Sequence, residues 1–221
     1  MQVGYQGEPG SHSHTAITHF YGKAEAVGFT SFKKVFDAVN SGKVQQCLVP
    51  IENSSVGTFW HVLDAAQEAG LHIIGEYQCV DDHVLCAHDE TDVKDIDTIY
   101  SHPYVFDQCQ TFILSRPNVS AVLSLDTAVC AKKVSLEKRA GSAAIVSSQC
   151  ARLYGLKIIL DSVADNLNSV TRYYVFSKTA ALIERHMDPQ TSLSVTLKNV
   201  TGSLAKAIVC FSNRDLKYMS F

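Results

Sequence analysis

The sequence predicts an α/β fold with a largely parallel sheet, and two observations carry this prediction. Short apolar runs alternate along the chain with segments of helical period that are roughly 10–15 residues long, which is the pattern of βαβ units. Hydrophobic residues make up 46% and charged residues 19% of the 221 residues, which suits one large domain, or one domain and part of a second. Because ligands of such folds bind outside the carboxyl ends of the strands, polar residues that follow apolar runs are the first site candidates.

Apolar spacing and turn residues predict the elements in chain order. Phe32, Val35, Phe36 and Val39 have the spacing of one helix face, and Gly42 is placed to end that helix. The strand-like stretch 71–87 is long enough to cross between two lobes. We expect strands at 1–5, 44–51, 71–87, 96–100, 119–125, 143–146, 157–160 and 172–177, with helices opening near residues 11, 32, 59, 103 and 126 and a short helix ending near 154.

The end of the chain is predicted to form a separate region. Residues 179–190 have the composition of a linker between a first region, 1–178, and a last one, 191–221. In the last region, 192–198 alternates like a strand, 201–212 is expected to be helical, and another strand begins near 216. This last region is too short to form an independent core of ordinary size.

Composition and charge exclude several classes of protein. The net charge is −3, from 19 Lys plus Arg against 22 Asp plus Glu, so the footprint of a nucleic-acid-binding protein is missing. Seven scattered cysteines without a CxxC pair are typical of buried thiols in a reducing compartment. No apolar run approaches the ~20 residues that span a bilayer. We therefore expect a cytoplasmic protein, or a plastid protein if a leader has been lost.

Four polar clusters occur where strands are expected to end and helices to begin. They are GEPGSHS at 7–13, PIENSSVG at 50–57, SHP at 101–103 with Gln108, and NSVTRY at 168–173. The first opens a helix whose free amide groups could hold an anion, although this segment taken alone favours an ordinary turn with a helix cap. The second carries four polar side chains in a row, which is more than helix capping requires.

The residue types in these clusters narrow the chemistry. They are hydroxyls, amides, histidines and one arginine, and Glu52 is the only carboxylate besides Glu8, which disfavours paired-carboxylate glycoside chemistry. The GxSxG, GxxxxGK[ST] and HExxH motifs are all absent. His12 and His14 form an HxH pair without a third ligand, so no metal is expected. This inventory suits binding of a small anion or dianion in a cleft.

Taken together, five motifs resemble the prephenate dehydratase family. They are YQGEPGSHSHTA at 5–16, VPIENSSVGT at 49–58, YSHPYVFDQC at 100–109, LYGL at 153–156 and NSVTRYYV at 168–175. The resemblance covers residues 1–178. It implies a catalytic domain of two lobes, similar to type II periplasmic binding proteins, with the active cleft between the lobes. It also implies conversion of prephenate to phenylpyruvate in phenylalanine biosynthesis, without cofactor or metal.

The resemblance also implies roles for individual residues. Thr171 takes the place of the catalytic threonine, and the other catalytic positions are Glu52, Asn53, Ser101 and Gln108. The expected substrate-binding residues are Ser11, Ser13, Ser54, Ser55, His102 and Arg172. Our hypothesis is that Thr171 donates a hydrogen bond or proton to the leaving hydroxyl, while Ser, Asn and backbone amide donors hold the side-chain carboxylate. Arg172, and the amide or hydroxyl groups that face Thr171, are the candidates to polarise it. Tyr173 stands where the family usually has Phe.

Residues 191–221 resemble the beginning of an ACT domain, a ferredoxin-like α+β regulatory module that binds phenylalanine in this family. Gly202, Ser203 and Leu204 lie where the family's GALV motif begins, so they are the expected effector-binding residues. The stretch corresponds to the first strand, the first helix and part of the second strand of a βαββαβ module. Either the sequence is truncated or the module is vestigial. A homo-oligomer is expected, because family members are commonly dimers or tetramers.

Three alternatives stay open from the sequence. The enzyme could use arogenate, the amino analogue of prephenate, and give phenylalanine directly. An ammonium group usually needs a carboxylate or carbonyls nearby, and Glu52 alone does not decide between the two substrates. The fold could also serve as a non-catalytic module that binds a small anion. Thirdly, the chain could be an assembly or regulatory subunit of a larger enzyme.

Overall fold

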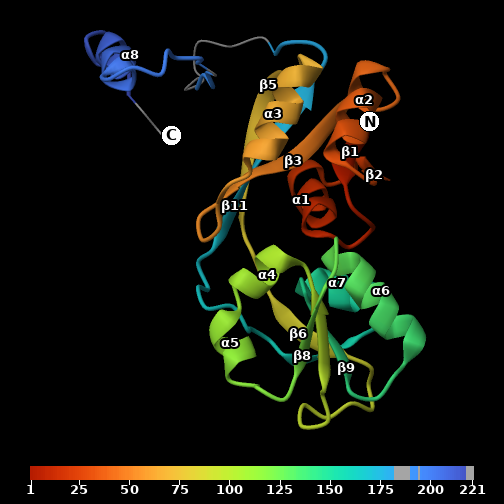
Figure 1. Cartoon of the computed structure of the whole chain (residues 1–221). Helices are drawn as coiled ribbons and strands as arrows, with labels where there is room; N and C mark the ends of the chain where they lie inside the picture. The colour runs from red at the N-terminus through yellow and green to blue at the C-terminus, as the bar shows by residue number, and fades with distance from the viewer. Residues whose placement is uncertain (182–189, 194, 218–221) are drawn as a thin grey trace. The chain divides into compact units, whose positions relative to one another are not determined.

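The chain separates into two units, residues 1–181 and 182–221. The computed structural model describes residues 1–181, 190–193 and 195–217. Unit 1 contains two lobes, each built from one mixed β-sheet with helices on both faces (Figure 1). The two-lobed α/β architecture that the sequence predicted is therefore confirmed.

The first lobe has the strand order β2-β1-β3-β11-β5, with β4 paired to β3. Helices α2 and α3 pack on one face around Phe36 and Phe176, and α1 packs on the other face around Tyr5 and Tyr173. The strands are β1 (Gln2–Gln6), β2 (Glu25–Phe29), β3 (Gln46–Asn53), β4 (Gly57–Thr58), β5 (His72–Val80) and β11 (Val170–Ser177). The helices are α1 (His12–Tyr21), α2 (Phe32–Asn40) and α3 (Trp60–Ala69).

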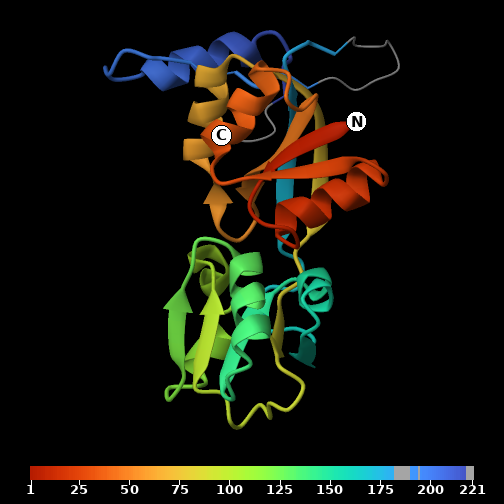
Figure 2. The same cartoon turned by 90° about the vertical axis from the view of Figure 1, so that its right-hand side faces the viewer.

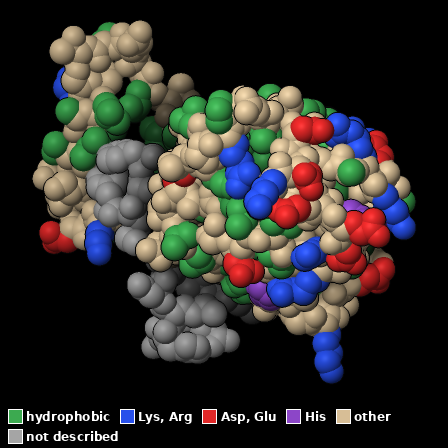
Figure 3. All heavy atoms as spheres, turned by 90° about the horizontal axis from the view of Figure 1, so that it is seen from below, with side chains coloured by type: hydrophobic (Ala, Val, Ile, Leu, Met, Phe, Trp, Pro, Cys, Tyr) green, Lys and Arg blue, Asp and Glu red, His purple; other side chains and the backbone are tan. Residues whose placement is uncertain are grey.

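The second lobe has the strand order β10-β6-β9-β7-β8. Helices α6 and α7 cover one face of this sheet, and α4 and α5 cover the other. The strands are β6 (Val84–Ala87), β7 (Thr98–Ser101), β8 (Ser120–Leu123), β9 (Ser142–Val146) and β10 (Lys157–Leu160). The helices are α4 (Pro103–Asp107), α5 (Gln110–Leu114), α6 (Thr127–Glu137) and α7 (Ser148–Leu153). Seen from below, basic and acidic side chains are interspersed over this part of the molecule (Figure 3).

The prediction of a largely parallel sheet is wrong, because both sheets are mixed. In the first lobe β1 runs parallel to β2 and β3, but β11 runs antiparallel to both β3 and β5. The reason is that the chain crosses twice between the lobes, out through β5 and β6 and back into β11 (Figure 2). The two crossings lie together, since the backbone N–H of Asp81 donates to the carbonyl of Ser169 at 2.9 Å.

Two other local differences have physical causes. The helix expected from Pro103 divides into α4 and α5, because the loop at Asp165 binds the chain at the junction. Its backbone N–H donates to the carbonyl of Gln108, and its carboxylate accepts from the N–H of Thr111. Strand β2 was not predicted, since it is an edge strand without a continuous apolar run.

Unit 2 contains helix α8 (Ser203–Ser212), which begins after Gly202 in the left-handed region at φ 81°. The strand predicted at 192–198 is wrong for the residues of that range that the structure describes. A strand needs a partner for its hydrogen bonds, and a single strand is not stable in water. The strand expected from 216 falls mainly on 218–221, outside the described residues. The domain limits 1–178, 179–190 and 191–221 stay predictions; β11 ends at Ser177.

The buried thiols that the sequence predicted are largely confirmed. All seven cysteines are free, five of them are buried, Cys79 is half-buried, and Cys210 in α8 is exposed. Among the described helices, none is both long and apolar enough to cross a membrane.

Two strand glycines provide a test of the packing in the first lobe. A Cβ on Gly28 would lie 2.6 Å from the carbonyl oxygen of Gly7, whereas a Cβ on Gly75 would approach no atom closer than 3.6 Å. We expect Gly28→Ala to lower the free energy of unfolding by about 1–3 kcal/mol through steric overlap. The matched Gly75→Ala variant should be neutral or more stable by about 0.5–1 kcal/mol. Urea unfolding measures both, and equal midpoints for the two variants would contradict this packing.

Candidate active site

A cavity of about 300 Å³ lies between the two lobes of unit 1. In the first lobe its walls come from α1, the starts of α2 and α3, β3, the β5–β6 crossing and β11, and in the second lobe from α4 and the start of α6. Polar and aromatic side chains share the lining. The polar groups that the chemistry can use include Ser11, His12, Ser13, Asn53, Asp81, His83, His102, Gln108, Asp126 and Thr171.

The amide of Asn53 is the centre of the polar wall. Asn53 ends β3 and is only 2% exposed. Its Nδ2 faces Asp81 Oδ2 at 2.8 Å, Ser169 Oγ at 3.0 Å and Thr171 Oγ1 at 3.0 Å, so its two hydrogens are shared among three acceptors. Its Oδ1 accepts from the backbone N–H groups of Ser55 and Val56 at 2.8 and 2.9 Å. Because both ends of the amide are engaged, its orientation is fixed.

Thr171 is held against a buried carboxylate. It lies on β11 directly opposite Asn53 in the strand register, and its Oγ1 donates to Asp81 Oδ2 at 2.7 Å. Burial raises the pKa of Asp81, while the charge of His12 and the hydrogen bonds from Thr171 and Asn53 oppose that rise. Asp81 therefore keeps a proton to higher pH than a solvated aspartate does.

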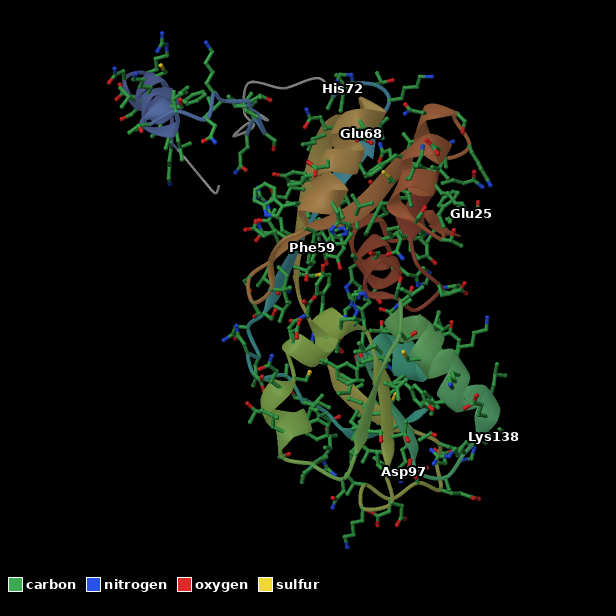
Figure 4. The ribbon with its side chains drawn as sticks, in the orientation of Figure 1. Glu25, Phe59, Glu68, His72, Asp97 and Lys138 are labelled. Atoms are coloured by element: carbon green, nitrogen blue, oxygen red, sulfur yellow. The ribbon has the colours of Figure 1, made fainter. Side chains whose placement is uncertain are left out.

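Ser169 and Gln108 extend this wall into the second lobe. Ser169 Oγ donates to Gln108 Oε1 at 2.7 Å, and Gln108 Nε2 donates to the carbonyl of Tyr104 at 3.3 Å. The ring of Tyr104 also stacks on Phe59, with centroids 5.2 Å apart and planes 20° apart. Phe59 lies at the end of the first lobe that faces α4 (Figure 4). One polar chain and one aromatic pair thus connect the lobes around the cavity.

Two histidine rings meet at the cavity wall. His83, in the β5–β6 crossing, is 2% exposed, and its ring lies edge-on to that of His12 with centroids 5.3 Å apart. Burial, and to a smaller extent the charge of His12, lower the pKa of His83 to about 4, while the hydrogen bond with Gln108 opposes the change. His83 is therefore uncharged near neutral pH, and it can offer one N–H donor to a ligand.

Asp126 closes the cavity from the second lobe. It caps α6 by accepting from the N–H of Ala128 at 2.7 Å, and it accepts from the N–H of Glu8 at 2.9 Å. Burial raises the pKa of the Asp126 carboxyl group. Nearby, the hydroxyl of Tyr154 donates to the carbonyl of Pro9 at 2.8 Å. The first polar cluster of the sequence is thus attached to the second lobe.

The structure brings only some of the predicted site residues to the cavity. Those that line it are Ser11, Ser13, Asn53, His102, Gln108 and Thr171, whereas Glu52, Ser54, Ser55, Ser101 and Arg172 are not among the lining residues. Ser101 is fully buried, and its Oγ donates to the carbonyl of Ile145 at 2.7 Å. Their catalytic and substrate-binding roles stay predictions.

Of the two kinds of group expected to polarise Thr171, the structure places the amide of Asn53 against it but not Arg172. Successive side chains of a strand point to opposite faces, so Arg172 lies on the far side of β11 from Thr171. There its guanidinium pairs with Glu76 at 2.6 Å and with Glu52 at 3.5 Å. The acidic partner of Thr171 is Asp81 instead.

Sequence reasoning missed Asp81, His83 and Asp126, and it gave Ser169 no role of its own although the cluster at 168–173 contains it. Glu8 and Glu52 are the carboxylates of the four polar clusters, but neither is among the lining residues; the carboxylates that line the cavity are Asp81 and Asp126, which lie outside those clusters. A signal was present in the sequence, since DDH at 81–83 interrupts an otherwise strand-like stretch where the chain was expected to cross between lobes. Within the part of the chain that the structure describes, no three His, Cys, Asp or Glu side chains are placed to hold a metal ion.

Comparison with known proteins decides the family. The sequence model described as prephenate dehydratase matches residues 3–181. The chain belongs to the prephenate dehydratase family. The resemblance that its motifs indicated is therefore confirmed.

Individual members of the prephenate dehydratase family are similar to this chain over nearly all of its length. It is 30% identical to arogenate dehydratase/prephenate dehydratase 2, chloroplastic, of Arabidopsis thaliana, over 98% of this chain and 56% of that protein. It is also 30% identical to the bifunctional chorismate mutase/prephenate dehydratase of Escherichia coli K12, over 97% and 57%. The crystal structure of prephenate dehydratase from Arthrobacter aurescens in complex with L-Phe has a TM-score of 0.84 and 27% identity, over 97% and 73%. The chain thus spans just over half the length of the two curated relatives.

The buried imidazole of His83 predicts a stability change with pH. Its pKa is about 4 in the folded protein and near 6.5 in the unfolded chain, so the unfolded chain binds more protons between these values. The free energy of unfolding should therefore fall as the pH is lowered from about 6.5 to about 4, by roughly 3 kcal/mol from this group. Urea unfolding at a series of pH values measures the slope, which His83→Gln should reduce.

The control for His83 is the exposed His72 at the far end of β5, away from Phe59 and the cavity (Figure 4). His72→Gln removes an imidazole without removing a buried one, so it should keep the slope of the unsubstituted protein. A slope unaffected by His83→Gln would contradict the depressed pKa.

Proposed function

We propose that the site converts prephenate to phenylpyruvate by loss of carbon dioxide and water, a carbon–oxygen lyase step of phenylalanine biosynthesis. The observation that carries this proposal is the hydroxyl of Thr171 on the cavity wall, bound by both Asn53 and Asp81. Family membership supports it, and so does a cavity of about 300 Å³, a size within the usual range for small ligands.

The reaction needs a donor at the departing oxygen. Prephenate carries two carboxylates and a ring hydroxyl, and loss of carbon dioxide together with that hydroxyl makes the ring aromatic. The barrier lies in expelling hydroxide, so a hydrogen placed at the hydroxyl by Thr171 lowers it. The elimination is redox-neutral, and the proposal therefore requires no cofactor.

The remaining predicted residues fit supporting roles in this proposal. Ser11, Ser13 and the first amides of α1 are donors for a substrate carboxylate, with His102 on the opposite wall. Ser101 and Glu52 do not line the cavity, and in this proposal they are positioning residues that hold the strands around it. Ser101 attaches the end of β7 to β9, and Glu52 faces Arg172 across the β3–β11 pair.

Arogenate is a second candidate substrate, because the cavity offers an ammonium group two partners. Asp81 and Asp126 line it, and no lysine or arginine is among the lining residues that the structure describes. In its ionised form either carboxyl group attracts an ammonium group and disfavours a dianion. The Arabidopsis relative carries both enzyme names.

Regulation by phenylalanine forms a separate part of the proposal. It rests on the resemblance of residues 191–221 to an ACT domain, and the Arthrobacter relative was solved with L-Phe. The expected effector residues Gly202, Ser203 and Leu204 lie at the start of α8, where Leu204 is 58% exposed. The homo-oligomer and the cytoplasmic location stay predictions.

The decisive assay incubates the protein with prephenate and, separately, with arogenate, and follows phenylpyruvate and phenylalanine. Thr171→Ala should lower kcat by about 10²–10⁴-fold, because the donor to the leaving hydroxyl is lost. Thr171→Ser keeps the hydroxyl and should retain much more activity. The exposed Thr111→Ala variant on α5 is the matched control and should behave as the unsubstituted protein.

Three outcomes of this assay differ in meaning. Turnover that depends on Thr171 supports the dehydratase, and the better substrate decides between prephenate and arogenate. Turnover unchanged in Thr171→Ala would contradict the role of this residue. Tight binding of either compound without any turnover would instead favour a non-catalytic binding module.

A further inference from the structure

We propose that Asp81 is the proton source of the reaction and passes its proton through the hydroxyl of Thr171 to the departing hydroxyl of the substrate. This inference rests on the proposed function and deepens it. It makes Asp81 a positioning and proton-relay residue that acts through Thr171, in the place where the sequence suggested Arg172.

The geometry of three side chains carries the inference. Thr171 Oγ1 and Asp81 Oδ2 are 2.7 Å apart, a short distance that suits proton transfer between oxygens. Asn53 Nδ2 lies 2.8 Å from the same Asp81 oxygen and 3.0 Å from Thr171 Oγ1, so the pair is held in place from one side. Both Asp81 and Thr171 line the cavity, while 8% and 6% of their surfaces remain exposed.

A count of hydrogens shows why the protonation of Asp81 matters. The hydroxyl of Thr171 has one hydrogen and two lone pairs. When Asp81 is ionised, Thr171 donates that hydrogen to the carboxylate, so none is left for a substrate. When Asp81 is protonated, its O–H donates to Thr171 Oγ1, which also accepts a hydrogen bond from Asn53 Nδ2. Both lone pairs of Thr171 are then filled and its hydrogen is free to point into the cavity.

The surroundings of Asp81 keep this proton in place. The groups that face it are His12 from α1, Asn53 from β3, and Thr171 and Tyr173 from β11. The neighbouring titratable groups in the same segment of the chain are Cys79, Asp82 and His83. His12 is the member of this set that favours the ionised form by its charge, while burial and Asp82 favour the protonated form. A bound substrate with two carboxylates adds more negative charge and favours the protonated form further.

The step balances in atoms and electrons. The Asp81 proton moves to Thr171 Oγ1 as the Thr171 hydrogen moves to the oxygen of the substrate hydroxyl. The ring carbon–oxygen bond breaks and its electron pair leaves with the oxygen, forming water. The bond from the ring to its carboxylate breaks as well, its pair enters the ring and completes the aromatic system, and carbon dioxide departs. Asp81 remains as a carboxylate and takes a proton from solvent, and no oxidant or reductant is needed.

The test compares Asp81→Asn with the matched variant Asp82→Asn. Asparagine keeps the shape of Asp81 and can still accept from Thr171, but it has no acidic proton to give. We expect kcat to fall about 10²-fold or more in Asp81→Asn. In the unsubstituted protein kcat should also fall as the pH rises through the pKa of Asp81, and this alkaline limb should be lost in Asp81→Asn.

The controls separate the relay from a merely structural effect. Asp82 is not among the cavity-lining residues and accepts from the backbone N–H of Ser148 at 2.8 Å, a bond that asparagine can keep. Asp82→Asn should therefore retain the rate on the acidic side and the alkaline limb itself, with the limb moved to lower pH because the charge of Asp82 favours the protonated form of Asp81. Thr171→Ser should retain the limb as well. Carboxyl ¹³C NMR of the unsubstituted protein provides a readout without turnover, and Asp81 should titrate above the usual aspartate range.

The outcomes distinguish this inference from the proposed function. If the unsubstituted protein turns over neither substrate, both proposals are overturned. If Thr171→Ala is inactive but Asp81→Asn keeps its rate and its alkaline limb, the dehydratase stands and the relay is wrong. An Asp81 carboxyl group that titrates in the ordinary range would likewise overturn the relay.

Discussion

The hydrogen bonds of the Asn53 amide hold together three segments that are far apart in the sequence. Through this one side chain the end of β3 contacts Asp81 in the outgoing crossing and Thr171 and Ser169 in the returning strand. A buried amide without partners is costly, so the segments are stable together only when all of them are in place. The polar wall of the cavity depends on this arrangement, because it fixes the position of the Thr171 hydroxyl beside Asp81.

The two crossings also explain why the sheets are mixed and why the site lies where it does. A chain that leaves the first lobe through β5 must return, and β11 returns antiparallel between β3 and β5. The returning strand therefore presents alternate side chains to the cavity and to the opposite face. Thr171 faces Asp81 on one side, while Arg172 is neutralised by Glu76 and Glu52 on the other. Thr171 and Arg172 are neighbours in one motif, but they contact different groups on opposite faces of β11.

Burial governs the charge of the groups around the cavity. His83 is kept uncharged, and the carboxyl groups of Asp81 and Asp126 hold their protons to higher pH than solvated carboxyl groups do. Acidic side chains that are easily protonated favour the binding of a small molecule with two carboxylates, because like charges in a partly closed cavity repel strongly. The polar wall is therefore a set of hydrogen-bond donors and acceptors more than a set of fixed charges.

The sequence by itself determined the family, the order of most helices and strands, and the position of Thr171 and Asn53 in the site. These features are local, since apolar periodicity, caps and motifs can be recognised within a few residues. Only the tertiary structure decided the antiparallel return of β11, the burial of Ser101 away from the lining, and the pairing of Thr171 with Asp81. That pair is separated by 90 residues in the chain, and Asn53 and Asp81 by 28. Such contacts follow from strand register and from the meeting of two lobes, which no local pattern encodes.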